Sequence, residues 1–270
     1  MSARPCALTI AGSDSGGGAG IQADLKTFMA HGCYGASVIT ALTAQNTRGV
    51  TGIHAPDPDF VALQLRTVLE DIPVRAAKTG MLFSAGIAGA VARGLADKSF
   101  PLVVDPVCVS QSGHRLLEED AVQAVIREAL PLADLATPNR PEAELLSGMA
   151  ITDRESLFAA LEKLLSFGPR AVLLKGGHME ERGGRLTDWL ALPGRAPLPL
   201  PVERVDTPHT HGTGCALSAA ITARLALGDG LEAAVRAAQV WLNRALRTGY
   251  AVGQGASPPD HLTGLAERAE

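Results

Sequence analysis

The segment from His211 to Cys215, His-Gly-Thr-Gly-Cys, combines residue types that could bind an anion and support group transfer. Its two glycines leave backbone N–H groups uncovered, and an apolar, alanine-rich helical sequence follows at once. The first N–H groups of a helix have no partner within the helix, and the helix dipole favours negative charge beside them. We therefore expect a phosphate at this turn, with an ordinary tight turn before a core helix as the alternative.

Three side chains around these glycines strengthen the expectation of a binding site. Thr210 and Thr213 add hydroxyl donors, and Cys215 adds an ionisable thiol. A cysteine in the first turn of a helix is expected to have a lowered pKa, because the positive helix end stabilises the thiolate. A turn with only a structural role does not need such a residue.

Oxygen-bearing residues and one lysine follow other apolar runs of the chain. Asp105, Asn139 and Glu142 could hold Mg²⁺ through waters, together with substrate phosphates. A helix cap explains Asn139 and Glu142 almost as well, because a proline stands between them at the expected helix start. Lys175 ends a run of Ala, Val and Leu, and a lysine leaving a buried strand needs an anion or water close by.

The glycine-dense segment 12–20 does not match the common nucleotide-binding fingerprints. It lacks the last glycine or alanine of the dinucleotide motif, and no Gly-Lys-Ser/Thr follows it, which disfavours a Rossmann dehydrogenase and a phosphate loop. Asp24 follows as either a surface carboxylate or a residue facing a cleft. Gln45 could offer one donor and one acceptor to an aminopyrimidine edge, although a solvated loop amide is the simpler interpretation.

Composition and net charge limit the classes of protein to which this chain can belong. The 270 residues are 46% hydrophobic and 19% charged, which fits one α/β domain over 1–270. A net charge of −4 without a basic run, and only 4% aromatic residues, argue against nucleic-acid binding. No segment has the length and apolarity of a signal or membrane-spanning helix, so we expect a cytoplasmic protein with no membrane partner.

Neither cysteine nor histidine spacing indicates a metal site. The four cysteines are scattered, so zinc and a disulfide framework are not expected, and Cys6, Cys33 and Cys108 read as small core residues. Likewise, we expect no metal cage from the histidines, namely His178, His209 and His211.

Apolar runs alternate with amphipathic segments along the chain, which is typical of βαβ units around a parallel sheet. The expected strands are 6–12, 36–45, 74–80, 101–107, 134–139 and 171–177, and the expected helices are 19–31, 59–70, 85–96, 119–130, one from Pro141, one from Asp153, 213–227 and 231–248. Two extended segments after residue 177 predict antiparallel strands at the sheet edge. Because ligands lie at the carboxyl ends of parallel strands, where the polar motifs fall, one cleft is expected there.

Taken together, the motifs resemble those of the hydroxymethylpyrimidine/phosphomethylpyrimidine kinase family of thiamine biosynthesis, within the ribokinase-like superfamily. The matching strings are AGSDSGGGAGIQADLKT, TALTAQNTRGV, KTGML, DPV, TPNRPEAE, LLKGGH and HTHGTGCALSAA. The resemblance implies a three-layer αβα sandwich, a homodimer, and phosphorylation by ATP and Mg²⁺ of 4-amino-5-hydroxymethyl-2-methylpyrimidine and then of its monophosphate.

The resemblance also implies roles for individual residues. Cys215 takes the catalytic position, and Gly212, Thr213 and Gly214 supply the anion hole. The pyrimidine is read by Gln45, helped by the backbone at Gly12, Met81 and Val107 and by Asp24. The nucleotide phosphates and Mg²⁺ are served by Asn139, Glu142, Lys175 and Thr210, with Asp105 nearby. The segment GQGASPPDHL near the end departs from the family pattern.

Two other functions stay open at this point. A pyridoxal or pyridoxine kinase of the same superfamily is the nearest, although the Gln45 carboxamide suits an aminopyrimidine better than the hydroxyl and methyl groups of pyridoxine. A non-catalytic nucleotide-binding protein is the other, and the retained glycines and Cys215 argue against it.

Overall fold

The computed structural model describes residues 4–108, 119–176 and 185–265. Within them, the strands form one nine-stranded sheet in the order β3-β2-β1-β4-β5-β6-β7-β8-β9. The parallel strands are β1 (Cys6–Asp14), β2 (Tyr34–Asn46), β4 (Val74–Thr79), β5 (Leu102–Val104), β6 (Leu135–Ala136) and β7 (Val172–Leu174). The antiparallel strands are β3 (Gly49–His54), β8 (Arg185–Ala191) and β9 (Leu198–Glu203).

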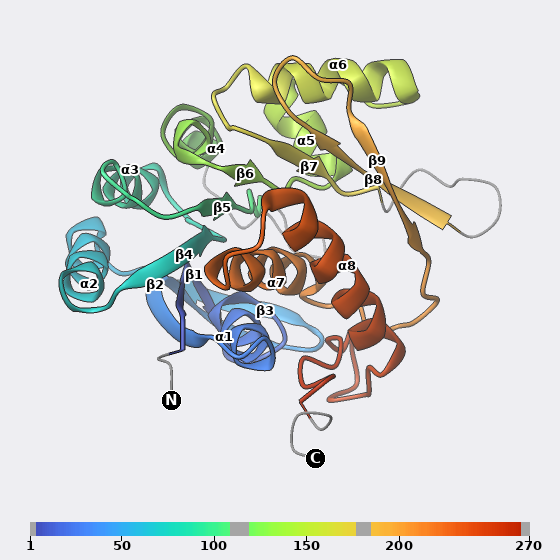
Figure 1. The fold of residues 1–270 in the computed structure, drawn as a ribbon. Coiled ribbons are helices and arrows are strands. Elements are labelled where there is room, and N and C mark those ends of the chain that lie inside the picture. Colours follow the sequence, from blue (N-terminus) through green and yellow to red (C-terminus); the bar gives the residue numbers. More distant parts are fainter. Residues whose placement is uncertain (1–3, 109–118, 177–184, 266–270) are drawn as a thin grey trace.

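Helices cover both faces of this sheet (Figure 1). One layer consists of α1 (Gly20–Ala30), α7 (Thr213–Ala226) and α8 (Leu231–Arg247). The other consists of α2 (Pro58–Asp71), α3 (Ala85–Gly94), α4 (Glu119–Ala124), α5 (Arg140–Ser147) and α6 (Arg154–Leu165). The predicted three-layer α/β sandwich, with a mainly parallel sheet and antiparallel edge strands, is confirmed.

The central strands are apolar throughout because both of their faces are buried. In β7, Val172 and Leu174 pack into the core under α2 to α6, whereas Leu173 packs under α7 and α8. Strands covered by helices on both sides read as continuous apolar runs rather than alternating ones. The edge strand β9 contains Pro199 and Pro201, which a central strand would not tolerate because proline has no N–H to donate.

The structure differs from the sequence expectations in two elements. The chain after β2 turns at Thr47 and Arg48 and returns as β3, a strand that is not among the expected ones and whose residues are mostly exposed. The helix expected over 119–130 is α-helical only to Ala124 and continues as a π-helical turn and a 3₁₀ turn. Among the described residues, no helix is long and apolar enough to cross a membrane.

Candidate active site

A cavity of about 560 Å³ lies at the carboxyl ends of the parallel strands, against the beginning of α7. Nearly all residues singled out in the sequence line it: Gly12, Gln45, Met81, Asp105, Val107, Asn139, Glu142, Lys175, Thr210, Gly212, Thr213, Gly214 and Cys215. They come from the ends of six parallel strands and from the starts of two helices, α5 and α7. The predicted meeting of these motifs in one cleft is therefore confirmed, whereas their individual roles stay predictions.

The turn before α7 is folded tightly around Gly212. Gly212 caps the helix with φ +74°, and an added Cβ would lie 2.0 Å from the Gly18 carbonyl oxygen, so only glycine fits. Thr213 donates to the Thr210 carbonyl through both its N–H (3.2 Å) and its hydroxyl (2.6 Å). The Thr213 hydroxyl thus folds the turn rather than offering the free donor we expected. The N–H groups of Gly214 and Cys215, in the first helical turn, have no intrahelical acceptor.

The Cys215 thiol lies half-buried in the cavity wall among charged groups, and this corrects the expected direction of its pKa. Burial raises the pKa of the thiol to about 11; Lys78 opposes the rise, while Asp24 and Asp105 add to it. Loss of solvation therefore outweighs the opposing effects of Lys78 and of the Gly20 N–H. The side chain is a protonated thiol at neutral pH.

Asp24 does not line the cavity, so the expected direct contact with substrate is wrong for this structure. Its carboxylate is fully buried behind the wall and pairs with Lys78 of β4, with Nζ to Oδ distances of 2.9 and 3.0 Å. The Thr9 hydroxyl donates to the same carboxylate at 2.6 Å. Burial alone would lower the pKa of the Lys78 ammonium. The negative charge of Asp24 opposes this, and the pKa of Lys78 is raised above its ordinary value. Asp24 therefore influences the cavity only indirectly, through its ion pair with Lys78 and through the effect of its charge on the pKa of Cys215.

A second cluster of charged and polar side chains is centred on Asp105, which directly follows β5. The Asp105 carboxylate accepts hydrogen bonds from Lys175 Nζ (3.1 Å), the Thr137 hydroxyl (3.0 Å) and the Ser218 hydroxyl (3.1 Å). An added Cβ on Gly214 would lie 3.4 Å from Lys175 Nζ, so the ammonium lies beside the first turn of α7. Burial alone would lower the pKa of the Lys175 ammonium. The negative charges of Asp105 and Glu142 oppose this, and the pKa of Lys175 is raised. The cavity therefore holds a fixed cation next to free helical N–H groups.

Asn139 and Glu142 form the cap of α5, as one of the two interpretations predicted, and they also line the cavity. Each side chain accepts a hydrogen bond from the other residue's backbone N–H at 2.9 Å. Burial raises the pKa of Glu142 to about 7; Lys175 opposes this rise, and Asp105 adds to it. The Lys175 ammonium therefore does not fully offset the cost of burying the Asp105 and Glu142 carboxylates together.

The acidic residues can hold a cation only with help from other ligands. In the part of the chain that the structure describes, no three His, Cys, Asp or Glu side chains form a metal-binding group. Asp105 and Glu142 offer two carboxylates to the cavity, which suits Mg²⁺ bound through waters and phosphates rather than a protein cage. His178 lies outside the described residues.

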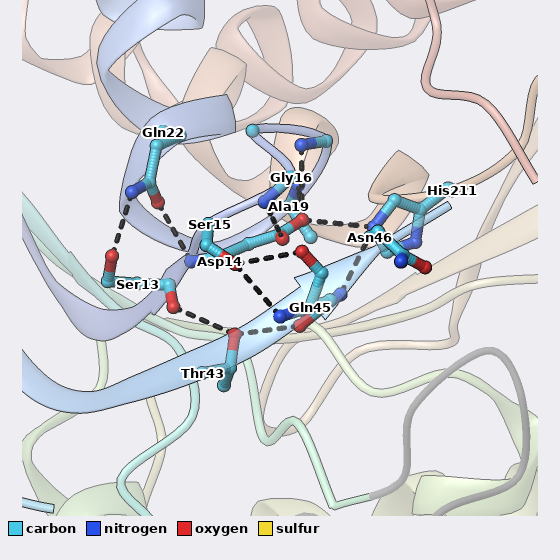
Figure 2. Close-up of polar contacts among 12 residues, drawn as sticks. Ser13, Asp14, Ser15, Gly16, Ala19, Gln22, Thr43, Gln45, Asn46 and His211 are labelled. Carbon is cyan, nitrogen blue, oxygen red and sulfur yellow. Dashed lines mark hydrogen bonds and ion pairs between the residues drawn. The ribbon is translucent and has the colours of Figure 1, made fainter. Parts of the chain in front are cut away.

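The glycine-dense loop is organised by a residue that the sequence reading passed over. The Asp14 carboxylate accepts the backbone N–H groups of Gly16 (2.8 Å), Gly18 (3.1 Å) and Ala19 (2.9 Å), and it lies 3.1 Å from His211 Nε2 (Figure 2). Its position two residues before three consecutive glycines was the available signal, since aspartate often accepts N–H groups of its own turn. The loop therefore provides a rigid wall rather than a flexible linker.

The C-terminal segment that departs from the family pattern also reaches this wall. The Ser257 carbonyl accepts the His211 N–H at 3.1 Å, and the Gly255 N–H donates to the Thr47 hydroxyl at 3.1 Å. An added Cβ on Gly255 would lie 2.0 Å from the Thr47 carbonyl oxygen. The segment thus braces both the turn before α7 and the β2–β3 turn from outside the cavity.

The comparisons of sequence agree on one family. The family sequence model described as phosphomethylpyrimidine kinase matches residues 14–260. The hydroxymethylpyrimidine/phosphomethylpyrimidine kinase of Rhizobium meliloti strain 1021 is 50% identical over 259 residues, which cover 95% of this chain and 96% of the relative.

Solved structures also match over most of the chain. The crystal structure of phosphomethylpyrimidine kinase from Clostridium difficile 630 is 42% identical with a TM-score of 0.79, covering 90% of this chain and 99% of that one. The pyridoxal kinase from Staphylococcus aureus, solved with AMP-PCP and pyridoxal, is 32% identical with a TM-score of 0.87, covering 100% and 97%.

Proposed function

The chain belongs to the phosphomethylpyrimidine kinase family, and from this premise we propose how its cleft carries out the reaction. It is a ribokinase-like kinase of thiamine biosynthesis that uses ATP to phosphorylate hydroxymethylpyrimidine and then its monophosphate. The observation that carries the assignment of roles is the order of groups along the sheet edge. An amide lies at the end of β2, and the carboxylates and Lys175 follow β5 to β7.

In our proposal the pyrimidine lies at the end of the cleft formed by β1, β2 and β4. Gln45 contributes one donor and one acceptor to the amino and ring-nitrogen edge. An added Cβ on Gly12 would lie 2.5 Å from Met81 Cε, so the glycine makes room for the methionine against which the ring packs. Val107 adds a further apolar contact from the loop after β5.

The phosphate end of the cleft is formed by α7, β5, β6 and β7. The N–H groups of Gly214 and Cys215 and the Lys175 ammonium receive the transferring phosphoryl group, whose charge they stabilise. Asn139 and Thr210 border the nucleotide phosphates. Asp105 and Glu142 would hold Mg²⁺ through waters, and Mg²⁺ would neutralise charge on the phosphates and on these two carboxylates.

Cys215 orients the substrate alcohol in this proposal. A thiol with a pKa of about 11 is protonated at neutral pH, so a preformed thiolate base would be rare. Phosphoryl transfer through a loose transition state needs in-line positioning more than early deprotonation of the alcohol. Cys215 therefore positions the hydroxymethyl oxygen, and it matters less in the second step, where the acceptor is an already ionised phosphate oxygen.

Product analysis by mass spectrometry tests this function. The enzyme with Mg-ATP and hydroxymethylpyrimidine should yield the mono- and then the diphosphate, and pyridoxal in a parallel reaction should be turned over far less well. The pyridoxal arm is included because a pyridoxal kinase shares the fold over the whole chain. Turnover of pyridoxal without turnover of the pyrimidine would refute the assignment. Homodimerisation and a cytoplasmic location stay predictions.

A further inference from the structure

The hydrogen bonds around Gln45 can be assigned by counting hydrogens. As placed, Gln45 Oε1 lies 3.0 Å from Thr43 Oγ1, and Gln45 Nε2 lies 3.3 Å from His211 Nε2 (Figure 2). His211 Nε2 also lies 3.1 Å from Asp14 Oδ2. An ionised carboxylate only accepts hydrogen bonds, so His211 Nε2 carries a hydrogen and donates it to Asp14. The same nitrogen then cannot accept from the Gln45 amide.

Thr43 leads to the same conclusion from the other side of the amide. Its hydroxyl has one hydrogen, and the Ser13 carbonyl, which can only accept, lies 2.9 Å away. When that hydrogen goes to Ser13, the shorter of its two contacts, the hydroxyl presents a lone pair toward Gln45. The oxygen and nitrogen of a carboxamide are assigned from their hydrogen-bond network. The orientation that avoids N–H against N–H turns Oε1 toward His211, where it shares the Nε2 hydrogen with Asp14 in a three-centre contact, and turns Nε2 toward Thr43.

We propose that Asp14 and His211 are positioning residues for pyrimidine recognition, because they fix which end of the Gln45 carboxamide is the acceptor. The inference rests on the proposed function, in which Gln45 reads the aminopyrimidine. With one N–H engaged by Thr43 and one lone pair engaged by His211, the amide keeps one donor and one acceptor for the substrate. A reversed amide would set its N–H against the substrate amino group, donor against donor.

Asp14 and His211 are held rigidly enough to orient the Gln45 carboxamide. Although burial opposes its charge, hydrogen bonds from His211 and from the backbone of Gly16 and Ala19 hold the pKa of Asp14 below its ordinary value. An added Cβ on Gly18 would lie 2.5 Å from His211 Cδ2, so the glycine lets the imidazole approach the loop closely. The backbone N–H of His211 donates a hydrogen bond to the Ser257 carbonyl, which fixes the backbone of this residue. Loop, imidazole and amide thus form one chain of contacts that ends at the substrate.

A double-mutant cycle tests the proposal with hydroxymethylpyrimidine as the varied substrate. His211→Leu should raise the KM for the pyrimidine about tenfold, the value of one hydrogen bond to an aligned partner, with kcat and the KM for ATP within about threefold. In a Gln45→Ala background the same change should alter KM less than twofold, because there is no amide left to orient. His211→Gln, which keeps an N–H donor near the Nε2 position, should restore most of the lost affinity.

His209→Leu is the matched control, since it changes a histidine of the same turn and should leave the pyrimidine KM within about twofold. Equal effects of His211→Leu with and without Gln45 would overturn the proposal, as would a loss shared by the KM for ATP, because both point to damage of the turn before α7. Wild-type turnover of the pyrimidine tests the proposed function separately, so the two failures are distinguishable.

Discussion

Replacing Glu142 with glutamine should stabilise the fold at neutral and alkaline pH while weakening nucleotide use. The folded state raises the pKa of this carboxyl from its ordinary 4.5 to about 7, chiefly by burial. Below pH 4.5 the group is protonated in both states and has no effect. Between 4.5 and 7 the unfolded chain ionises first, so the wild-type protein loses stability as pH rises. Above pH 7 the full difference is present, about 3 kcal/mol at about 1.4 kcal/mol per pKa unit.

Glutamine removes this cost and keeps the cap, because its amide oxygen can still accept the Asn139 N–H. Urea unfolding should show Glu142→Gln gaining about 3 kcal/mol over wild type at pH 8 and under about 1 kcal/mol at pH 5. The KM for Mg-ATP should rise in the variant, and its fall between pH 6 and 8 in the wild type should disappear. Glu162→Gln, an exposed change on α6, should stay within about 0.5 kcal/mol. An equal gain at both pH values, or a loss at pH 8, would refute the reasoning.

Three further predictions concern the start of α7. Cys215→Ala should slow the first phosphorylation at least about tenfold more than the second, measured as separate rates with hydroxymethylpyrimidine and its monophosphate; equal losses would remove the positioning role. Iodoacetamide labelling of Cys215, followed by peptide mass spectrometry, should accelerate about tenfold per pH unit up to pH 10, and a plateau above pH 8 would contradict the raised pKa. Gly212→Ala should destabilise the protein by clearly more than Gly228→Ala in urea unfolding, since both glycines have positive φ but only Gly212 would bring a Cβ against a carbonyl; similar losses would show that the turn yields.

Local patterns were enough to predict the sheet and the place of the cleft. Apolar runs such as Val172 to Leu174 carry the signature of strands buried on both faces, and the carboxyl ends of parallel strands must meet at one edge. The cap formed by Asn139 and Glu142 was also readable, because all its contacts fall within four residues. β3 was not readable, since a polar edge strand such as Gly49–His54 has no apolar alternation and is defined by its pairing with β2.

What the sequence could not supply depends on contacts between distant segments. The pairing of Asp24 with Lys78 joins α1 to β4, and it withdraws from the cavity a carboxylate that had been expected to contact the substrate. The pKa of Cys215 was predicted in the wrong direction, because its helix position is visible in the sequence but its burial is not. The contact between Asp14 and His211 spans most of the chain and belongs to neither motif alone.

The central claim is that the pyrimidine and the transferred phosphoryl group meet in the cleft between Gln45 and the start of α7. A crystal structure with hydroxymethylpyrimidine and a non-hydrolysable ATP analogue tests this most directly. We predict the amino edge of the pyrimidine on Gln45 and the terminal phosphoryl group within hydrogen-bond distance of the Gly214 and Cys215 N–H groups and Lys175. A terminal phosphoryl group bound elsewhere, or a pyrimidine that does not reach Gln45, would contradict the account.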